Sequence, residues 1–178
     1  MKITVLTGSP HEQGTTALLT ERFIAGAEAA GHEVYRFDGA EKAVSPCIAC
    51  EACGQGSAHC VFDDDMDELN PHLLEADVIA FVTPLYYSGM SAQLKVIIDR
   101  FYANDSKLGG SGKKCVLLAA CADDTDTAMK PLIAHYKDYT GYLQWESVGM
   151  VLATGCADRA AVEKTDFPQQ AYDLGKSL

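Results

Sequence analysis

The sequence predicts an α/β fold in which five parallel strands form a central sheet with helices on both faces. Two observations support this prediction. Short runs rich in β-branched and aliphatic residues alternate with longer segments of helical periodicity, which is typical of a parallel sheet. The run at 116–120 is apolar throughout, as expected for a strand covered on both faces. Right-handed crossovers then favour the strand order 2-1-3-4-5.

Local signals bound several of the expected elements. The strands are expected at 2–7, 33–37, 78–83, 114–121 and 144–152, and the helices at 16–30, 65–74, 92–102, 127–140 and 168–176. In the first helix the apolar residues fall on one face, and Gly31 supplies its C-terminal stop. Ser91 is a suitable N-cap for the third helix. The acidic run at 63–68 is expected to be solvated and to favour the start of the second helix, where carboxylates are stabilised.

Length, charge and cysteine content limit the possible functions. The 178 residues fit one domain, 1–178, with an irregular insertion at about 38–64. A formal net charge of −11 argues against nucleic acid or an anionic membrane as a partner. No apolar run approaches the roughly 20 residues that span a bilayer, and the N-terminus leads directly into a strand. We therefore expect a cytoplasmic protein, in which seven cysteines indicate metal or redox chemistry rather than a disulfide framework.

A loop of glycine and hydroxyl residues follows the first strand and opens the first helix. Glycine lets the backbone approach a ligand, and a helix start presents amides suited to a phosphate. No Walker lysine follows this loop, and the G-x-G-x-x-G pattern is not satisfied. Ordinary N-capping is the alternative, but the position after the first strand favours phosphate binding. The candidate residues are Ser9, His11, Gly14, Thr15 and Thr16.

A second candidate loop follows the third strand. Pro84 turns the chain out of the sheet, and the adjacent rings of Tyr86 and Tyr87 could stack on a flat ligand. Backbone amides after them could reach ring heteroatoms, although the tyrosines could instead pack on a surface or a subunit interface. The candidate ring-binding residues are Pro84, Leu85, Tyr86, Tyr87, Ser88, Gly89 and Met90.

The topology brings these two loops together. In the order 2-1-3-4-5 the switch point lies between strands 1 and 3, and ligands bind at the carboxyl ends of those strands. A phosphate site beside a site for a flat ring describes a pocket for flavin mononucleotide (FMN).

The motifs at 8–16 and 83–100 resemble those of the NADPH-dependent FMN reductase family of the flavodoxin-like superfamily. The resemblance implies a flavodoxin-like three-layer sandwich and an oxidoreductase. Such an enzyme takes hydride from NAD(P)H and passes electrons to a quinone, flavin, nitro compound or similar acceptor. The resemblance also implies a homodimer or homotetramer, with phosphate at Ser9, His11, Thr15 and Thr16 and the flavin ring at 84–90. Relatives commonly have asparagine in place of Thr15, but a hydroxyl can still donate. No catalytic residue is assigned, because the flavin supplies the chemistry.

Four cysteines in the insertion form a second motif with the spacing C-x2-C-x2-C-x6-C, at Cys47, Cys50, Cys53 and Cys60. Such a loop can turn its thiolates toward a [4Fe-4S] cluster. The spacing resembles that of iron–sulfur flavoproteins, which implies an electron-transfer module that receives electrons from ferredoxin. A thiol-bearing flap near the flavin, a zinc site, packed thiols and a disulfide remain alternatives, as does a thiol-based redox sensor. The other cysteines, Cys115, Cys121 and Cys156, are expected in the core.

Overall fold

A computed structural model describes residues 1–55, 59–125 and 127–178. Its strands are β1 (Lys2–Thr7), β2 (Glu33–Asp38), β3 (Val78–Pro84), β4 (Lys114–Ala120) and β5 (Glu146–Ala153). They form one sheet in the order β2-β1-β3-β4-β5 with every neighbouring pair parallel, which confirms the predicted fold class. The fifth strand begins two residues later than expected, because Gln144 has a left-handed φ of 57° that a strand cannot contain.

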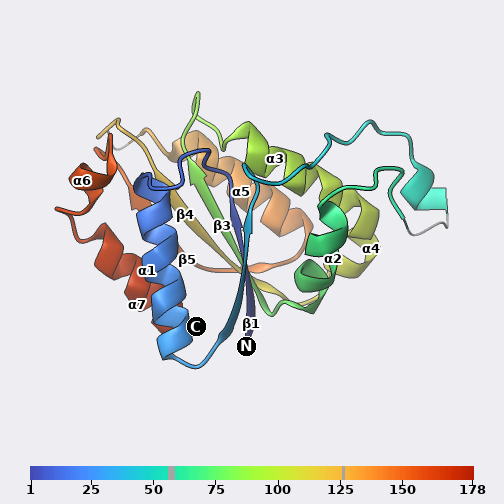
Figure 1. Cartoon of the computed structure of the whole chain (residues 1–178), viewed down its shortest axis with the longest axis horizontal. Helices are drawn as coiled ribbons and strands as arrows, with labels where there is room; N and C mark the ends of the chain where they lie inside the picture. The colour runs from blue at the N-terminus through green and yellow to red at the C-terminus, as the bar shows by residue number, and fades with distance from the viewer. Residues whose placement is uncertain (56–58, 126) are drawn as a thin grey trace.

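Helices cover both faces of the sheet (Figure 1). They are α1 (Thr15–Ala29), α2 (Met66–Glu75), α3 (Ala92–Asp99), α4 (Asp105–Leu108), α5 (Lys130–Tyr142), α6 (Arg159–Val162) and α7 (Phe167–Lys176), with 3-10 turns η1 (Ala52–Gln55) and η2 (Arg100–Asn104). All five expected helices are present, although the third ends early and continues as η2. The sequence did not predict η1, α4 or α6, because four residues are too few to show a helical period. In Figure 1, α1, α6 and α7 lie on one side of the sheet and α2, α3, α4 and α5 on the other.

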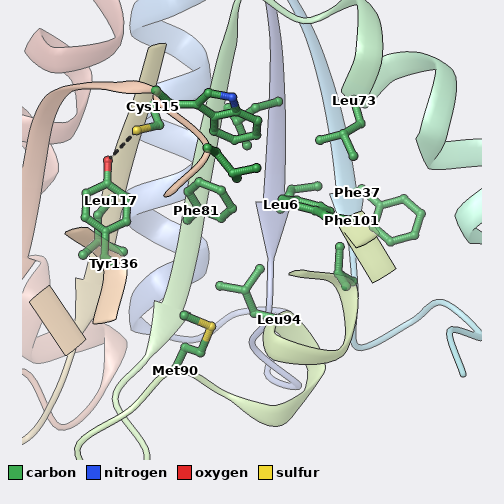
Figure 2. Packing of buried hydrophobic residues seen from close by; sticks show 14 of the residues in the cluster. Leu6, Phe37, Leu73, Phe81, Met90, Leu94, Phe101, Cys115, Leu117 and Tyr136 are labelled. Atoms are coloured by element: carbon green, nitrogen blue, oxygen red, sulfur yellow. Dashed lines mark hydrogen bonds between the residues drawn. The ribbon is translucent and has the colours of Figure 1, made fainter. Parts of the chain in front are cut away.

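Strand residues alternate between two apolar cores. On β3, Phe81 faces the core that α2, α3 and α5 cover, whereas Val82 faces the core under α1, α6 and α7. Figure 2 shows the first of these cores, in which Phe81 lies among Leu6, Leu94 and Tyr136. Both faces of the sheet are thus buried, as the apolar fourth strand predicted.

The loops at the carboxyl ends of the strands gather along one edge of the sheet, at the top of Figure 1. Gly31, with a φ of 82°, ends α1 as expected at the opposite edge. Within the described part of the chain, no helix combines the length and apolar character needed to cross a bilayer. Because ligands of open parallel α/β sheets bind at the carboxyl ends of the strands, a ligand site is expected at this carboxyl edge.

Candidate functional site

A cleft of about 980 Å³ opens at the carboxyl edge of the sheet. It is at the upper end of the size range of small-molecule sites, which is roughly 300–1,000 Å³. Four loops line it, one after each of β1, β3, β4 and β5. The lining residues are Ser9, Pro10, His11, Glu12, Gln13, Gly14, Thr15, Pro84, Leu85, Tyr86, Ala120, Cys121, Ala122, Cys156, Ala157, Asp158, Arg159 and Ala160.

The β1–α1 loop is a tight turn that leads into α1. The His11 amide donates to Ser9 Oγ (3.2 Å), and the Gly14 amide donates to the His11 carbonyl (3.1 Å). Gly14 is the N-cap of α1, and no side chain caps the helix at this end. The amides of the first turn therefore have no intrahelical acceptor, and Gly14 and Thr15 line the cleft. A Cβ at Gly14 would lie 3.0 Å from His11 Cβ, so a larger residue would require His11 to shift slightly.

Gly8 holds the two candidate loops against each other. Its amide donates to the Val82 carbonyl of β3 (2.9 Å), which fixes the exit of β1 beside that of β3. A Cβ at Gly8 would lie 2.2 Å from Ser91 Oγ and 2.6 Å from Leu94 Cβ, both at the start of α3. The absence of a side chain at this position therefore lets α3 approach the phosphate-type loop.

The β3–α3 loop is closed at its base and at its tip. At the base, the Ser91 amide donates to Thr83 Oγ1 (2.9 Å), and Ser91 caps α3 as expected by accepting from the Leu94 amide. At the tip, Tyr86 and Gly89 exchange two backbone hydrogen bonds of 2.9 and 3.0 Å. The two residues between them, Tyr87 and Ser88, have φ of 47° and 65°. This turn requires left-handed backbone at both positions and normally contains glycine or asparagine, so it is strained.

The structure places seven of the twelve candidate flavin-site residues on the cleft. These are Ser9, His11, Gly14, Thr15, Pro84, Leu85 and Tyr86. Thr16 is buried beneath the loop and lines a small neighbouring polar cavity instead. Tyr87 and Ser88 form the exposed tip of the turn beside the half-buried Gly89, and the Tyr87 side chain is fully exposed. Met90 points into the core beside Leu94 (Figure 2).

Sequence reasoning missed the wall of the cleft that follows β5. Cys156, Asp158 and Arg159 lie there. All three cysteines expected in the core are buried, but Cys121 and Cys156 also line the cleft. Burial raises the pKa of both thiols. Cys121 and Cys156, which form the floor of the cleft at the ends of β4 and β5, are therefore uncharged. The carboxyl end of β5 shares its edge with β1 and β3, and that position is the signal that could have revealed these residues.

The cysteine-bearing segment lies apart from the cleft wall after β5. In Figure 1 it extends beyond α2 and α3, on the side of the molecule away from α6. Cys47 and Cys50 are exposed, and Cys53 and Cys60 are half-buried. Ala49 and Glu51 flank Cys50 with left-handed φ of 53° and 58°. Residues 56–58, within the expected motif, lie outside the described residues; among the rest, no three His, Cys, Asp or Glu side chains gather as a metal site.

Arg100 anchors this segment to the end of α3. Its guanidinium donates to the Ser45 carbonyl (2.8 Å) and pairs with Asp64 (2.7 Å), and it lies over the Phe62 ring. Burial works to lower the pKa of Arg100, but the hydrogen bond and ion pair with Asp64 raise it above its usual value. The expectation that the acidic run is solvated is thus wrong for Asp64, which is withdrawn from solvent by its basic partner.

The sequence profile of the NADPH-dependent FMN reductase family matches residues 1–155. An iron–sulfur flavoprotein of Methanocaldococcus jannaschii is 37% identical over 100 residues, which cover 56% of this chain and 51% of that protein. A Bacillus subtilis protein named as an NAD(P)H-dependent FMN-containing oxidoreductase is 28% identical over 162 residues, 87% of this chain and 86% of its own. The chain spans about half the length of the iron–sulfur flavoproteins it matches.

A solved structure gives the same fold over nearly the whole chain. The NAD(P)H:quinone oxidoreductase from Methanothermobacter marburgensis is similar with a TM-score of 0.77 at 19% identity, over 98% of this chain and 94% of that one. At this level of identity the likeness concerns the fold.

Proposed function

The chain belongs to the NADPH-dependent FMN reductase family, and from this premise we propose that its single domain binds FMN in the cleft and passes electrons from NAD(P)H to a second acceptor. Family membership makes the chain an oxidoreductase and implies FMN and NAD(P)H. One observation carries the assignment to the cleft: the loops after β1 and β3, which flank the switch point of the sheet, line the same cavity.

The phosphate of FMN would bind the β1–α1 loop. The uncapped start of α1 supplies amide donors and the positive end of the helix dipole. Ser9 and Thr15 line the cleft and add hydroxyl donors, while Gly14 leaves the loop open where a Cβ would crowd His11. The residues present therefore fit a phosphate.

The flavin ring would lie between the β3–α3 loop and the floor formed by the ends of β4 and β5. Pro84, Leu85 and Tyr86 offer apolar and aromatic surface on one side. Cys121 and Cys156 are buried neutral thiols on the floor. An uncharged surface of this kind fits a largely uncharged ring.

When bound, FMN supplies a ring that takes a hydride from the nicotinamide donor and then passes two electrons to the acceptor, such as a quinone, a flavin or a nitro compound. The side chains of the cleft bind and orient the ligands and exclude water from them. None of them is required to act as an acid or a base.

The proposal is tested by anaerobic titration of the FMN-loaded protein with NADH or NADPH. We expect the visible flavin band to bleach and to return when a quinone is added.

Thr15→Val should lower FMN affinity by about tenfold, because one hydrogen bond to a charged group is lost. Thr15→Ser keeps the hydroxyl and is the matched control. A wild-type protein that binds no flavin would exclude the proposed function.

A second proposal concerns the four cysteines of the insertion, which we infer hold a [4Fe-4S] cluster supplied with electrons by ferredoxin. Their spacing and the iron–sulfur flavoprotein names of several relatives support it. The donor set suits iron, but the described thiols are not gathered around one centre, so no reaction step is derived through a cluster. Anaerobic purification with iron and sulfide analysis tests it, and Cys50→Ser should lower the iron content while Cys115→Ser should not.

We further propose a homodimer or homotetramer in which the Tyr86–Gly89 turn meets a second subunit. A strained turn that carries a fully exposed aromatic ring supports this assembly. Sedimentation of the wild type and of Tyr87→Ser tests it, since the variant should shift the equilibrium toward the monomer. A wild-type protein that sediments as a monomer would reject it.

A further inference from the structure

The wall of the cleft after β5 contains a paired cation. Arg159 is the only arginine or lysine among the described residues that line the cleft. Its two Nη atoms donate to the two carboxylate oxygens of Glu21 at 3.1 and 2.8 Å, and its Nε donates to Glu163 at 3.2 Å. This guanidinium is therefore already neutralised by protein carboxylates before any ligand enters.

The remaining charges around the cleft are acidic. Glu12 and Asp158 line the cleft, whereas Glu21 and Glu163 do not line it but pair with Arg159, so the one cationic side chain of the described lining brings no net positive charge to a cleft with two further carboxylates. The whole chain carries a formal charge of −11, which adds to the negative potential. A bound FMN phosphate would make this potential more negative, because the β1–α1 loop offers it uncharged amides and hydroxyls and no lysine or arginine.

We infer that this cleft selects its co-substrates by charge, preferring NADH to NADPH and uncharged or cationic acceptors to anionic ones. This inference rests on the proposed function. NADPH differs from NADH by a 2′-phosphate, which carries about −1.5 to −2 charges at neutral pH. That group would enter an acidic site in which the one guanidinium is held by Glu21 and Glu163. Arg159 and its two partners are thus the specificity-determining group.

The size of the effect follows from Coulomb's law. A divalent phosphate about 10 Å from one carboxylate in water is disfavoured by about three- to fourfold in binding, and several such carboxylates compound this at low salt. We therefore expect NADPH-type ligands to bind about tenfold more weakly than NADH-type ligands. The difference should shrink in about 0.5 M salt, where the screening length is only a few ångström.

The test uses the FMN-loaded protein and the unreactive oxidised nucleotides NAD⁺ and NADP⁺, whose binding is followed by perturbation of the flavin absorption band. We expect a higher Kd for NADP⁺ than for NAD⁺ in about 0.02 M salt and a ratio closer to one in about 0.5 M salt. Glu21→Gln should lower the ratio by about threefold, because it frees Arg159 from one carboxylate. Glu28→Gln removes the same charge from an exposed site further along α1 and should leave the ratio unchanged.

Steady-state rates provide a second readout. With NADH as donor, reduction of anionic ferricyanide should become faster as salt is added, whereas reduction of a neutral benzoquinone should change little. NADP⁺ binding as tight as that of NAD⁺, or a ratio that Glu21→Gln leaves unaltered, overturns the inference while the proposed function stands. A protein that does not bind FMN at all rejects both, and that result is distinguishable because no flavin band is present.

Discussion

The guanidinium of Arg100, at the end of α3, forms a buried ion pair with Asp64, in the segment that carries the four cysteines. Nη1 and Oδ2 are 2.7 Å apart, and the two side chains are only 3% and 8% exposed. A second hydrogen bond joins Nη2 to Oδ1 (3.2 Å), so the pair is bidentate. Because α3 begins at the β3–α3 loop of the cleft and ends beside Arg100, one short helix connects the proposed flavin site with the segment that carries the four cysteines.

Removal of the Arg100 charge should destabilise the protein strongly. Arg100→Met leaves the buried carboxylate of Asp64 without its cationic partner, and such a loss typically costs about 3–5 kcal/mol. The double variant Arg100→Met/Asp64→Leu removes both charges and should recover part of this loss. Urea unfolding followed by circular dichroism measures the free energies, and limited proteolysis should detect a loosened segment at 45–64 in the single variant. Equal stability of wild type and Arg100→Met would show that the pair does not hold the segment.

Asp64 should make stability depend on pH in the acid range. Hydrogen bonds from Arg100 and from backbone amides outweigh burial and hold the pKa of Asp64 below its usual value. A depressed carboxyl pKa adds stability above the unfolded-state pKa, about 3.9, and this stability is lost as pH falls through the folded-state pKa. Asp64→Asn should therefore flatten the decline of unfolding free energy below about pH 4.

The control for this pH experiment is Asp99→Asn. Asp99 forms a half-exposed ion pair with Lys95, and such pairs contribute about 0–1 kcal/mol. The acid decline of this variant should match the wild type. A decline in Asp64→Asn as steep as that of the wild type would assign the acid sensitivity to other groups.

Gly8→Ala should weaken the protein and its flavin site together. The new Cβ would clash with Ser91 Oγ and Leu94 Cβ, at 2.2 and 2.6 Å, and would separate the β1–α1 loop from α3. Overpacking of this kind costs about 1–3 kcal/mol. Gly141→Ala, within α5 and with no neighbour inside 4 Å, should instead stabilise by about 0.5–1 kcal/mol. Thermal melting with and without FMN measures both effects, and a Gly8→Ala protein with wild-type stability and FMN affinity would exclude this packing role.

Ser88→Gly should stabilise the β3–α3 turn. A left-handed conformation costs a non-glycine residue about 1–2 kcal/mol, and Ser88 adopts it with a φ of 65°. Part of this gain is offset by the backbone entropy of glycine, so a net gain of about 0.5–1 kcal/mol is expected. Ser88→Val should have the opposite sign, because β-branched residues tolerate positive φ poorly. Identical melting temperatures for the three proteins would mean that the turn stores no strain.

The sequence predicted the fold well because the sheet is buried on both faces. Neighbouring strand residues such as Phe81 and Val82 must both be apolar, so the central strands β3 and β4 read as nearly continuous apolar runs. Residues fixed by long-range contacts were not predictable in this way. The partner of Arg100 lies 36 positions away at Asp64, and no local pattern links them.

The candidate site was predicted only in part, because local residue types reveal some of its residues and long-range contacts fix the others. Ser9, Thr15 and Tyr86 belong to loops whose residue types carry a chemical signal, and all three line the cleft. Met90 lies in the same loop, but the turn at Tyr86–Gly89 directs it back into the core. Arg159 gave no signal, because its place at the cleft depends on the position of β5 beside β4, and its partners are Glu21 of α1 and Glu163, which follows α6.

The binding of FMN compared with that of riboflavin tests the flavin assignment most directly. The two ligands share the ring and ribityl chain and differ only in the phosphate, so their affinity ratio measures the contribution of the β1–α1 loop. We expect FMN to bind about 100-fold more tightly than riboflavin, because two hydrogen bonds to a charged group contribute about this much. Thr15→Val should reduce this ratio by about tenfold and leave riboflavin binding unchanged. Riboflavin binding as tight as FMN binding, or an equal loss of both in Thr15→Val, would refute a phosphate site at the start of α1.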